Sequence, residues 1–239
     1  MVLRGNPAII AGFGGPAHRF PRGHACAYNG GMRLPLWLKI GWTIWLIFWA
    51  PLYWRQYGAQ NFLFFCDLGN ILIGLALWLE SPLIFSWQAT GLLLFQTLYT
   101  VDLAGALLSG KHLIGGTEYM FDAHIPLSVR LLSLFHVVMV PLLLWAIVRL
   151  GYDERGGKLQ TLTAWIVVPV NFFWRPEMDV NWARGPFFHE QHVVPGVVYL
   201  AAYLIVVPMV VYWPTHLVLR WWIRRRIVIP SGARNPYGA

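Results

Sequence analysis

The sequence predicts an all-α protein, a polytopic transmembrane helical bundle of about six spans. Three observations lead to this fold class. The chain of 239 residues is 57% hydrophobic and only 12% charged, whereas a soluble domain has about 25% charged residues. Six segments come close to the roughly 20 apolar residues that a spanning helix needs. The basic residues also gather on one side of these segments, as they do in membrane proteins.

The chain opens on a segment unlike the rest. Residues 1–31 are rich in Gly, Pro, His and Arg, show no periodicity and lack the apolar core of a signal peptide. We expect a disordered leader here. Met32 lies directly before Arg33 and the first apolar run, so it is an alternative translation start. Residues 32–223 then form one membrane domain, and residues 224–239 form a basic, disordered cytoplasmic tail.

The expected spans follow one another closely along the membrane domain. They cover about 36–54, 61–80, 82–108, 126–149, 159–174 and 193–219. The third is apolar until it meets Asp102, and the fifth is short and closes near Asn171. Trp residues near the span ends fit the aromatic belts of a bilayer interface.

The distribution of basic residues predicts the orientation. With six spans both termini share a side, and that side collects thirteen of the 18 Lys and Arg residues. The other side keeps five: Arg55, Lys111, Arg130, Arg175 and Arg184. Without the leader the ratio is still ten to five. Because basic loops stay in the cytoplasm, we expect both termini there. The same rule accounts for the net charge of +8 without a nucleic-acid partner.

The two long outer loops collect carboxylates and histidines. The run FFHEQH at 187–192 resembles the zinc pattern H-E-x-x-H, although His189 and His192 are three residues apart rather than four. Glu118, Asp122 and His124 in the other outer loop are further candidate ligands. Mixed sets of this kind fit many cations or none, so these five residues are either metal ligands or solvated loop residues.

Three polar residues fall inside expected spans. Asp67 lies about six residues into the second span, His136 about ten residues into the fourth, and Asn171 near the outer end of the fifth. All three project into the outer half of the bundle. Ionisable groups in a bilayer are costly, so they face the interior and mark function or helix contacts. Arg130 is a candidate counter-ion for Asp67, and Asp67 is a candidate to orient His136.

Several motifs carry a resemblance. NFLFFCD, GTEYMFD, RLLSLFH, GYDERGGKLQT, VNFFWRPEMDVNW and YWPTHL together resemble an uncharacterised bacterial family of membrane-associated proteins, over about Leu34 to Trp222. That resemblance implies a bacterial inner (plasma) membrane and no particular activity.

Cys66, His136 and Asn171 are also similar in position to residues of YwaF-like integral membrane proteins. This second resemblance implies relatedness to intramembrane acyltransferases and ester hydrolases. A His expected shortly before the Cys is absent, and Val137 replaces the Gly expected after His136.

Two function classes follow from these observations. In the first, the protein is an intramembrane enzyme that acts on lipid by acyl transfer or ester hydrolysis. Cys66 is then the nucleophile and His136 its base, with Asp67 or Asn171 orienting the ring. A thiol in apolar surroundings is inert without such a base. In the second, the protein is a non-catalytic lipid-binding protein, scaffold or accessory subunit. Membrane lipids and other membrane subunits are the expected partners, and the sequence identifies no cofactor.

Overall fold

The protein is described by a computed structural model over residues 34–174, 178–186 and 189–228. These residues are mostly helical, and none of them forms a strand, so the predicted all-α class is confirmed. The expected leader at 1–31 lies outside the described residues. Of the expected tail, residues 224–228 continue the last helix, and the remainder lies outside the described residues.

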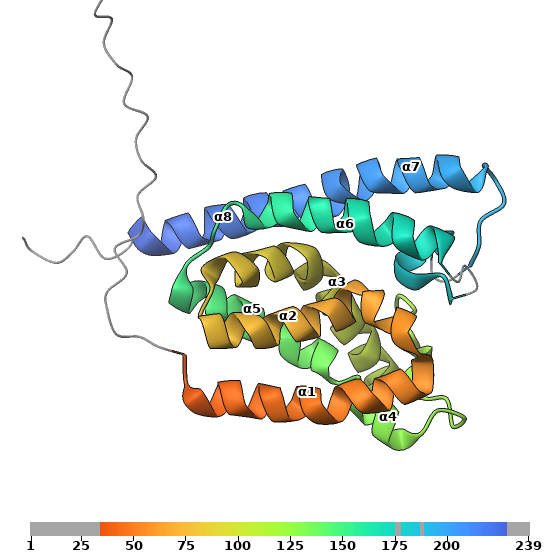
Figure 1. Ribbon diagram of the computed structural model, residues 1–239, viewed down its shortest axis with the longest axis horizontal. Coiled ribbons are helices and arrows are strands. Elements are labelled where there is room, and N and C mark those ends of the chain that lie inside the picture. The colour runs from red at the N-terminus through yellow and green to blue at the C-terminus, as the bar shows by residue number, and fades with distance from the viewer. Residues whose placement is uncertain (1–33, 175–177, 187–188, 229–239) are drawn as a thin grey trace, which may run out of the picture. The chain divides into compact units, whose positions relative to one another are not determined.

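The described residues form eight α-helices joined by short turns and two longer loops (Figure 1). In chain order the α-helices are α1 Leu36–Tyr57, α2 Phe65–Leu79, α3 Pro82–Ser109, α4 Leu127–Leu132, α5 Phe135–Leu150, α6 Gly156–Phe173, α7 Gly196–Val207 and α8 Trp213–Val228. Short 3₁₀ helices lie at η1 Ala59–Leu63, η2 Glu118–Met120 and η4 Val180–Trp182, and a π-helical turn, η6 Pro208–Tyr212, joins α7 to α8.

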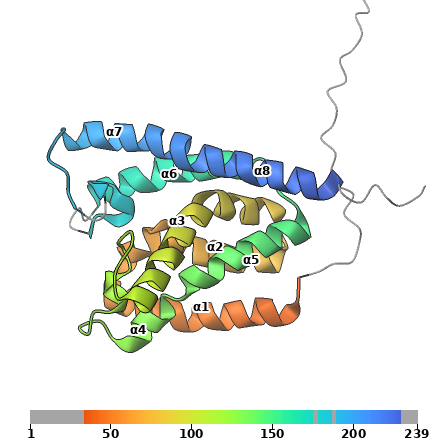
Figure 2. The same ribbon diagram turned by 180° about the vertical axis from the view of Figure 1, so that it is seen from behind.

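Helix α3 lies at the centre of the bundle. It packs against α2, α5, α6 and α8, and Figure 2 shows it alongside α5. Small residues let these helices approach closely, as is usual in membrane bundles. A Cβ on Gly156 would lie 2.6 Å from the backbone carbon of Ser86, and one on Gly69 would meet the side chain of Leu92 at 2.4 Å. Glycine is therefore required at Gly156, where backbone of α3 is the neighbour, whereas at Gly69 the Leu92 side chain would have to move.

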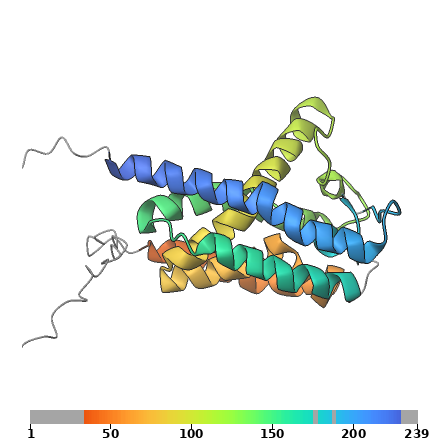
Figure 3. The same cartoon turned by 90° about the horizontal axis from the view of Figure 1, so that it is seen from above.

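Helices α1 and α7–α8 lie on opposite outer sides of the bundle (Figure 1). They expose large apolar side chains, among them Phe48 at 63% and Val210 at 64%. Burial of apolar surface is the main favourable term in water, so such exposure fits a lipid environment. In Figure 3 the C-terminal part of α3 points away from the axis that most of the other helices share.

Four helical segments are long and apolar enough to cross a membrane: Leu36–Tyr57, Pro82–Ser109, Leu127–Leu150 and Gly196–Arg226. They indicate a membrane protein. The segments expected at 61–80 and 159–174 are not among the four. The first is shortened because residues 59–63 form a 3₁₀ helix, which leaves α2 with 15 residues. The second, α6, has 18 residues but begins with the polar run Gly156–Gln160.

Polar contacts join the helices at the end of the bundle near Leu34 and Val228. The Lys39 ammonium lies 2.6 Å from the Glu80 carboxylate, which ties α1 to the α2–α3 turn. Tyr152, in the α5–α6 turn, hydrogen-bonds His216 of α8 at 2.8 Å. These contacts fix one end of the bundle, and the candidate functional residues lie toward the other.

Candidate functional site

The start of α2 carries the buried carboxylate. Asp67 is 2% exposed, so the prediction that it faces the bundle interior is confirmed. Its place along the helix differs from the prediction. Because α2 begins at Phe65, Asp67 lies in the first turn rather than six residues into a span. A carboxylate is favoured there, since the helix dipole and the unpaired N–H groups of the first turn attract negative charge.

The hydrogen-bond partners of Asp67 are local. The Asn61 side-chain amide donates to Asp67 Oδ2, and Cys66 Sγ lies 3.9 Å from Asp67 Oδ1. The predicted counter-ion, Arg130, donates instead to the backbone carbonyls of Ile125 at 3.0 Å and Met120 at 3.1 Å. Within the described ranges Asp67 therefore bonds neither Arg130 nor His136, because the turn before its own helix supplies the donor.

A residue distant in sequence holds the start of α2 in place. The Asn181 side chain accepts from the Phe65 backbone N–H at 2.9 Å and donates to the Leu63 carbonyl at 2.7 Å. Gln60 donates to the Trp174 carbonyl at 2.6 Å in the same region. Asn181 has a positive φ of 59°, a conformation that Asn tolerates better than most residues. The loop after α6 therefore positions Cys66 and Asp67.

Cys66 is the second residue of α2 and is partly buried. Among the described residues no hydrogen bond joins its thiol to His136. Phe135 relates the two indirectly. Cys66 packs against the hydrophobic core that includes Phe135, and the rings of Phe135 and Tyr99 stack on that of His136 with centroids 4.1 and 4.4 Å apart. These contacts define a cluster around His136 that consists of Ser133, Phe135 and Tyr99. Cys66 packs against the same core with its thiol beside the Asp67 carboxylate.

His136 follows a break in the fourth apolar segment. Helix α4 ends at Leu132 and α5 begins at Phe135. Between them the bonding tightens to i−3, since the Ser133 N–H donates to the Arg130 carbonyl at 3.0 Å and the His136 N–H to the Ser133 carbonyl at 3.2 Å. The Ser133 carbonyl also lies 2.6 Å from His136 Nδ1. A carbonyl can only accept, so Nδ1 carries the proton and Nε2 carries the lone pair in the neutral ring. The break therefore fixes the imidazole tautomer, and the stacked ring of Phe135, at 4.1 Å between centroids, fixes its orientation.

Hydroxyl groups complete the cluster. Tyr53 of α1 hydrogen-bonds Ser133, and Tyr99 of α3 hydrogen-bonds Tyr119 of η2 at 2.9 Å. Burial raises the pKa of the Tyr119 hydroxyl well above its usual value, and the neighbouring hydroxyls of Tyr99 and Tyr53 raise it further. Sequence reasoning missed these tyrosines, because nothing in their spacing separates them from ordinary interfacial aromatics. Together they supply neutral hydrogen-bond donors around His136.

Asn171 makes no hydrogen bond to the cluster around His136 among the described residues. It lies in the last turns of α6 and is 1% exposed, and both polar atoms of its side chain lack a hydrogen-bond partner within the described ranges. Leaving a buried amide unsatisfied costs about 1–3 kcal/mol. The structure therefore gives Asn171 free hydrogen-bonding capacity, but no bond to Cys66, Asp67 or His136.

The five candidate metal ligands do not assemble. In the part of the chain that the structure describes, no group of three or more His, Cys, Asp or Glu side chains is placed to hold a metal ion. The candidates from the two loops, Glu118, Asp122 and His124 on one and His189 and His192 on the other, make separate contacts. The Glu118 carboxylate accepts from the Gly116 N–H at 2.6 Å, and Asp122 accepts from the His124 N–H at 2.8 Å.

A second imidazole is fixed by Asp102, which is fully buried in α3. Oδ1 of Asp102 accepts from the N–H groups of Ile114 at 2.7 Å and Gly115 at 3.0 Å. Oδ2 accepts from the Thr117 hydroxyl and lies 3.0 Å from His112 Nδ1. This carboxylate organises the loop after α3. The signal in the sequence was an Asp inside an apolar segment, followed by the Gly-containing run KHLIGGT.

Comparisons with known proteins add no relative. No family model matches this chain, no curated protein matches it, and no solved structure matches it. The proposals that follow therefore depend on the residues and contacts described above.

Proposed function

We propose that this chain is a six-span protein of a bacterial inner membrane, with both termini cytoplasmic, and that it acts on membrane lipid by acyl transfer or ester hydrolysis. Six spans are favoured because, if α2 and α6 also cross, each of the six segments crosses the membrane in the direction opposite to the one before it. At 1.5 Å per residue α6 is about 27 Å long, close to the roughly 30 Å of a bilayer core. Orientation is inferred from the excess of Lys and Arg near the termini.

The observation that supports the catalytic proposal most is the tautomer of the His136 ring. The Ser133 carbonyl holds its Nδ1, which leaves Nε2 as the basic atom. Cys66 is partly buried and packs against the core that includes Phe135, the neighbour of His136. The Tyr53 hydroxyl bonds Ser133, and the Tyr99 ring stacks on His136. A base whose tautomer is fixed and a thiol nearby are the two parts that nucleophilic catalysis requires.

The proposed reaction uses these groups in sequence. His136 Nε2 takes the proton of the Cys66 thiol as Sγ forms a bond to the ester carbonyl carbon. The tetrahedral intermediate collapses, the bond to the leaving alkoxide breaks, and the imidazolium returns the proton to that alkoxide. Water or a second alcohol then attacks the thioester as His136 Nε2 takes its proton. The bond to Sγ breaks, and the imidazolium returns that proton to the thiolate.

A labelling experiment tests this proposal. The Cys26→Ser variant leaves Cys66 as the single thiol, since the chain has two cysteines. In phospholipid vesicles we expect a chloroacetamide with an acyl tail to alkylate Cys66, and added phospholipid to protect it. The His136→Gln substitution should slow alkylation about 100-fold, as expected for loss of a general base. Equal labelling by a short, water-soluble chloroacetamide, with no effect of His136→Gln, would contradict the enzyme and favour the non-catalytic lipid-binding or accessory role.

The six-span topology makes a separate prediction. Reporter fusions after Glu118 and after Arg155 should lie on opposite sides of the membrane, with Glu118 outside. The physical reason is that α4–α5 crosses once between them, and that the α5–α6 turn carries Arg155 and Lys158. Alkaline phosphatase should be active in the first fusion and inactive in the second. The same activity in both fusions would be incompatible with the topology.

A further inference from the structure

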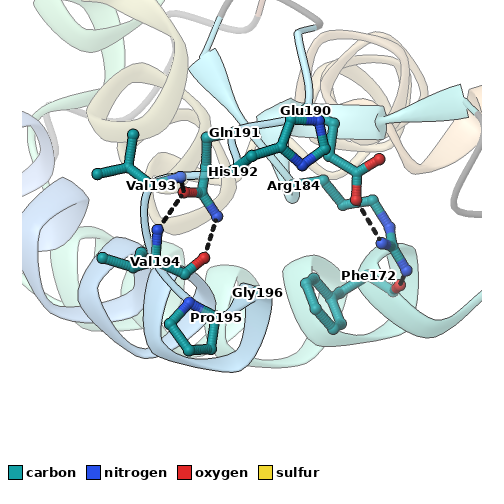
Figure 4. A pocket seen from close by; sticks show the side chains of 9 residues that line it. All are labelled: Phe172, Arg184, Glu190, Gln191, His192, Val193, Val194, Pro195 and Gly196. Atoms are coloured by element: carbon teal, nitrogen blue, oxygen red, sulfur yellow. Dashed lines mark hydrogen bonds and ion pairs between the residues drawn. The ribbon is translucent and has the colours of Figure 1, made fainter.

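A cavity lies between the end of α6 and the start of α7. Its volume is about 340 Å³, within the range of small-ligand sites. Phe172, Arg184, Glu190 and Gly196 are among the residues that line it (Figure 4). It is distinct from the cluster around His136, since none of the residues that line it belongs to that cluster.

Arg184 gives the cavity a cation that is held in place. Its guanidinium lies 4.6 Å from the centre of the Phe172 ring, donates to the Phe172 carbonyl at 3.0 Å and pairs with Glu190 at 3.0 Å. These contacts use one N–H on each terminal nitrogen of the five that a guanidinium carries, and Nε is buried with no hydrogen-bond partner among the described residues. The guanidinium is therefore oriented without being saturated, and a planar donor of this kind matches phosphate oxygens.

The first turn of α7 gives a second, independent positive feature. Pro195 precedes this helix and no side chain caps it, so the first N–H groups at Gly196 are available to an anion. A Cβ on Gly196 would lie 3.1 Å from the Phe172 ring, so glycine allows the helix to begin this close to the cavity. Gln191 lies on the same side of the cavity as the start of α7, where its side chain bonds Val193 and Val194 at 3.0–3.1 Å (Figure 4).

The rim of the cavity is apolar and exposed. Val193 is 92% exposed and Val197 62%, and both adjoin the start of a helical segment that is long and apolar enough to span a membrane. The ends of spanning helices lie at the level of lipid headgroups. At the level of the lipid headgroups the site therefore combines three features: anion-binding groups, the Glu190 carboxylate and an apolar rim.

From this combination we infer that the cavity binds the headgroup of a zwitterionic phospholipid. Arg184 and the first turn of α7 hold the phosphate. Glu190, whose side chain is 53% exposed, turns from Arg184 to the lipid ammonium group. Val193 and Val197 contact the acyl chains. This site depends on membrane insertion alone, and it stands whether or not Cys66 and His136 catalyse a reaction.

Lipid binding to the full-length protein tests the inference. In a phosphate-free detergent, native mass spectrometry should show phosphatidylethanolamine bound at least about tenfold more tightly than diacylglycerol of the same chains, the scale expected for charge-assisted hydrogen bonds to phosphate. Phosphatidylglycerol should bind more weakly than phosphatidylethanolamine, and Glu190→Gln should remove that preference. Free phosphoethanolamine should not compete at equal concentration, because it lacks the chains.

Variants separate the site from the fold. Arg184→Gln and Val193→Asp should each weaken phosphatidylethanolamine binding about tenfold, through lost phosphate contacts and through a charge at the apolar rim. Arg155→Gln, which removes an exposed cation paired with Asp153, should leave binding unchanged. Val193→Asp keeps the test valid if Arg184→Gln fails to fold, because Val193 is exposed. Equal binding of diacylglycerol, full binding by Val193→Asp, or equal competition by phosphoethanolamine would each overturn the inference.

Discussion

Replacing His136 with alanine should lower lipid turnover at least about 100-fold, since a positioned general base contributes 10²–10⁴-fold. The effect arises because Nε2 is the basic atom that the Ser133 carbonyl leaves free. Turnover is measured as release of fatty acid and lysophospholipid from vesicles that contain the purified protein, with Cys66→Ala as the variant that lacks the nucleophile.

The matched control for this substitution is His124→Ala. His124 lies in the loop between α3 and α4 and is exposed. Its bond to Asp122 uses its backbone N–H, so removing its ring should leave turnover unchanged. His136→Gln, which keeps a polar side chain of similar size, guards against simple loss of packing between Phe135 and Tyr99. Wild-type turnover in either His136 variant would refute the role of His136 as base.

The second large effect concerns Asp102. Asp102→Ala removes the acceptor for Ile114, Gly115, Thr117 and His112, and we expect it to release the loop after α3 at a cost of about 3 kcal/mol or more. Lys111 is exposed in that loop, so trypsin should cleave after it much faster than in the wild type. Asp102→Asn should give an intermediate rate, since its carbonyl oxygen still accepts from two N–H groups.

Asp122→Ala provides the comparison for Asp102. Its carboxylate is exposed and holds the His124 N–H two residues further along, so its loss should change cleavage little. If trypsin cleaves Asp102→Ala after Lys111 no faster than the wild type, Asp102 does not organise the loop.

Sequence reasoning located Asp67 in the interior, because a carboxylate cannot face acyl chains at low cost. It misplaced the start of the helix, since Phe62, Leu63 and Phe64 are apolar whether they form a 3₁₀ turn or an α-helix. The break before Phe135 was equally hidden. Neither Gly nor Pro marks it. The Ser133 hydroxyl at the break bonds Tyr53 of another helix, and that contact exists only in the packed bundle.

The sequence alone could not predict hydrogen bonds between residues that lie far apart in the chain. Asn181 bonds Phe65 across 116 positions of the chain, and no local pattern relates the two. The candidate residues themselves were found because burial of polar groups is unusual in apolar segments. Their partners depend on the packing of whole helices. Composition therefore predicted the class of protein and part of the candidate site, and tertiary structure supplied the hydrogen bonds.

The continuous segment Gly196–Arg226 has 31 residues, or about 46 Å of helix against a hydrocarbon core of roughly 30 Å. This mismatch requires the helix to tilt or to extend beyond the core. Arg225 and Arg226 lie over the rings of Trp221 and Trp222, at 4.3 and 4.7 Å, and such pairs anchor a helix at the interface. With that end fixed, a thicker bilayer would set the helix more upright. The depth of Gly196 at its far end would then follow membrane thickness.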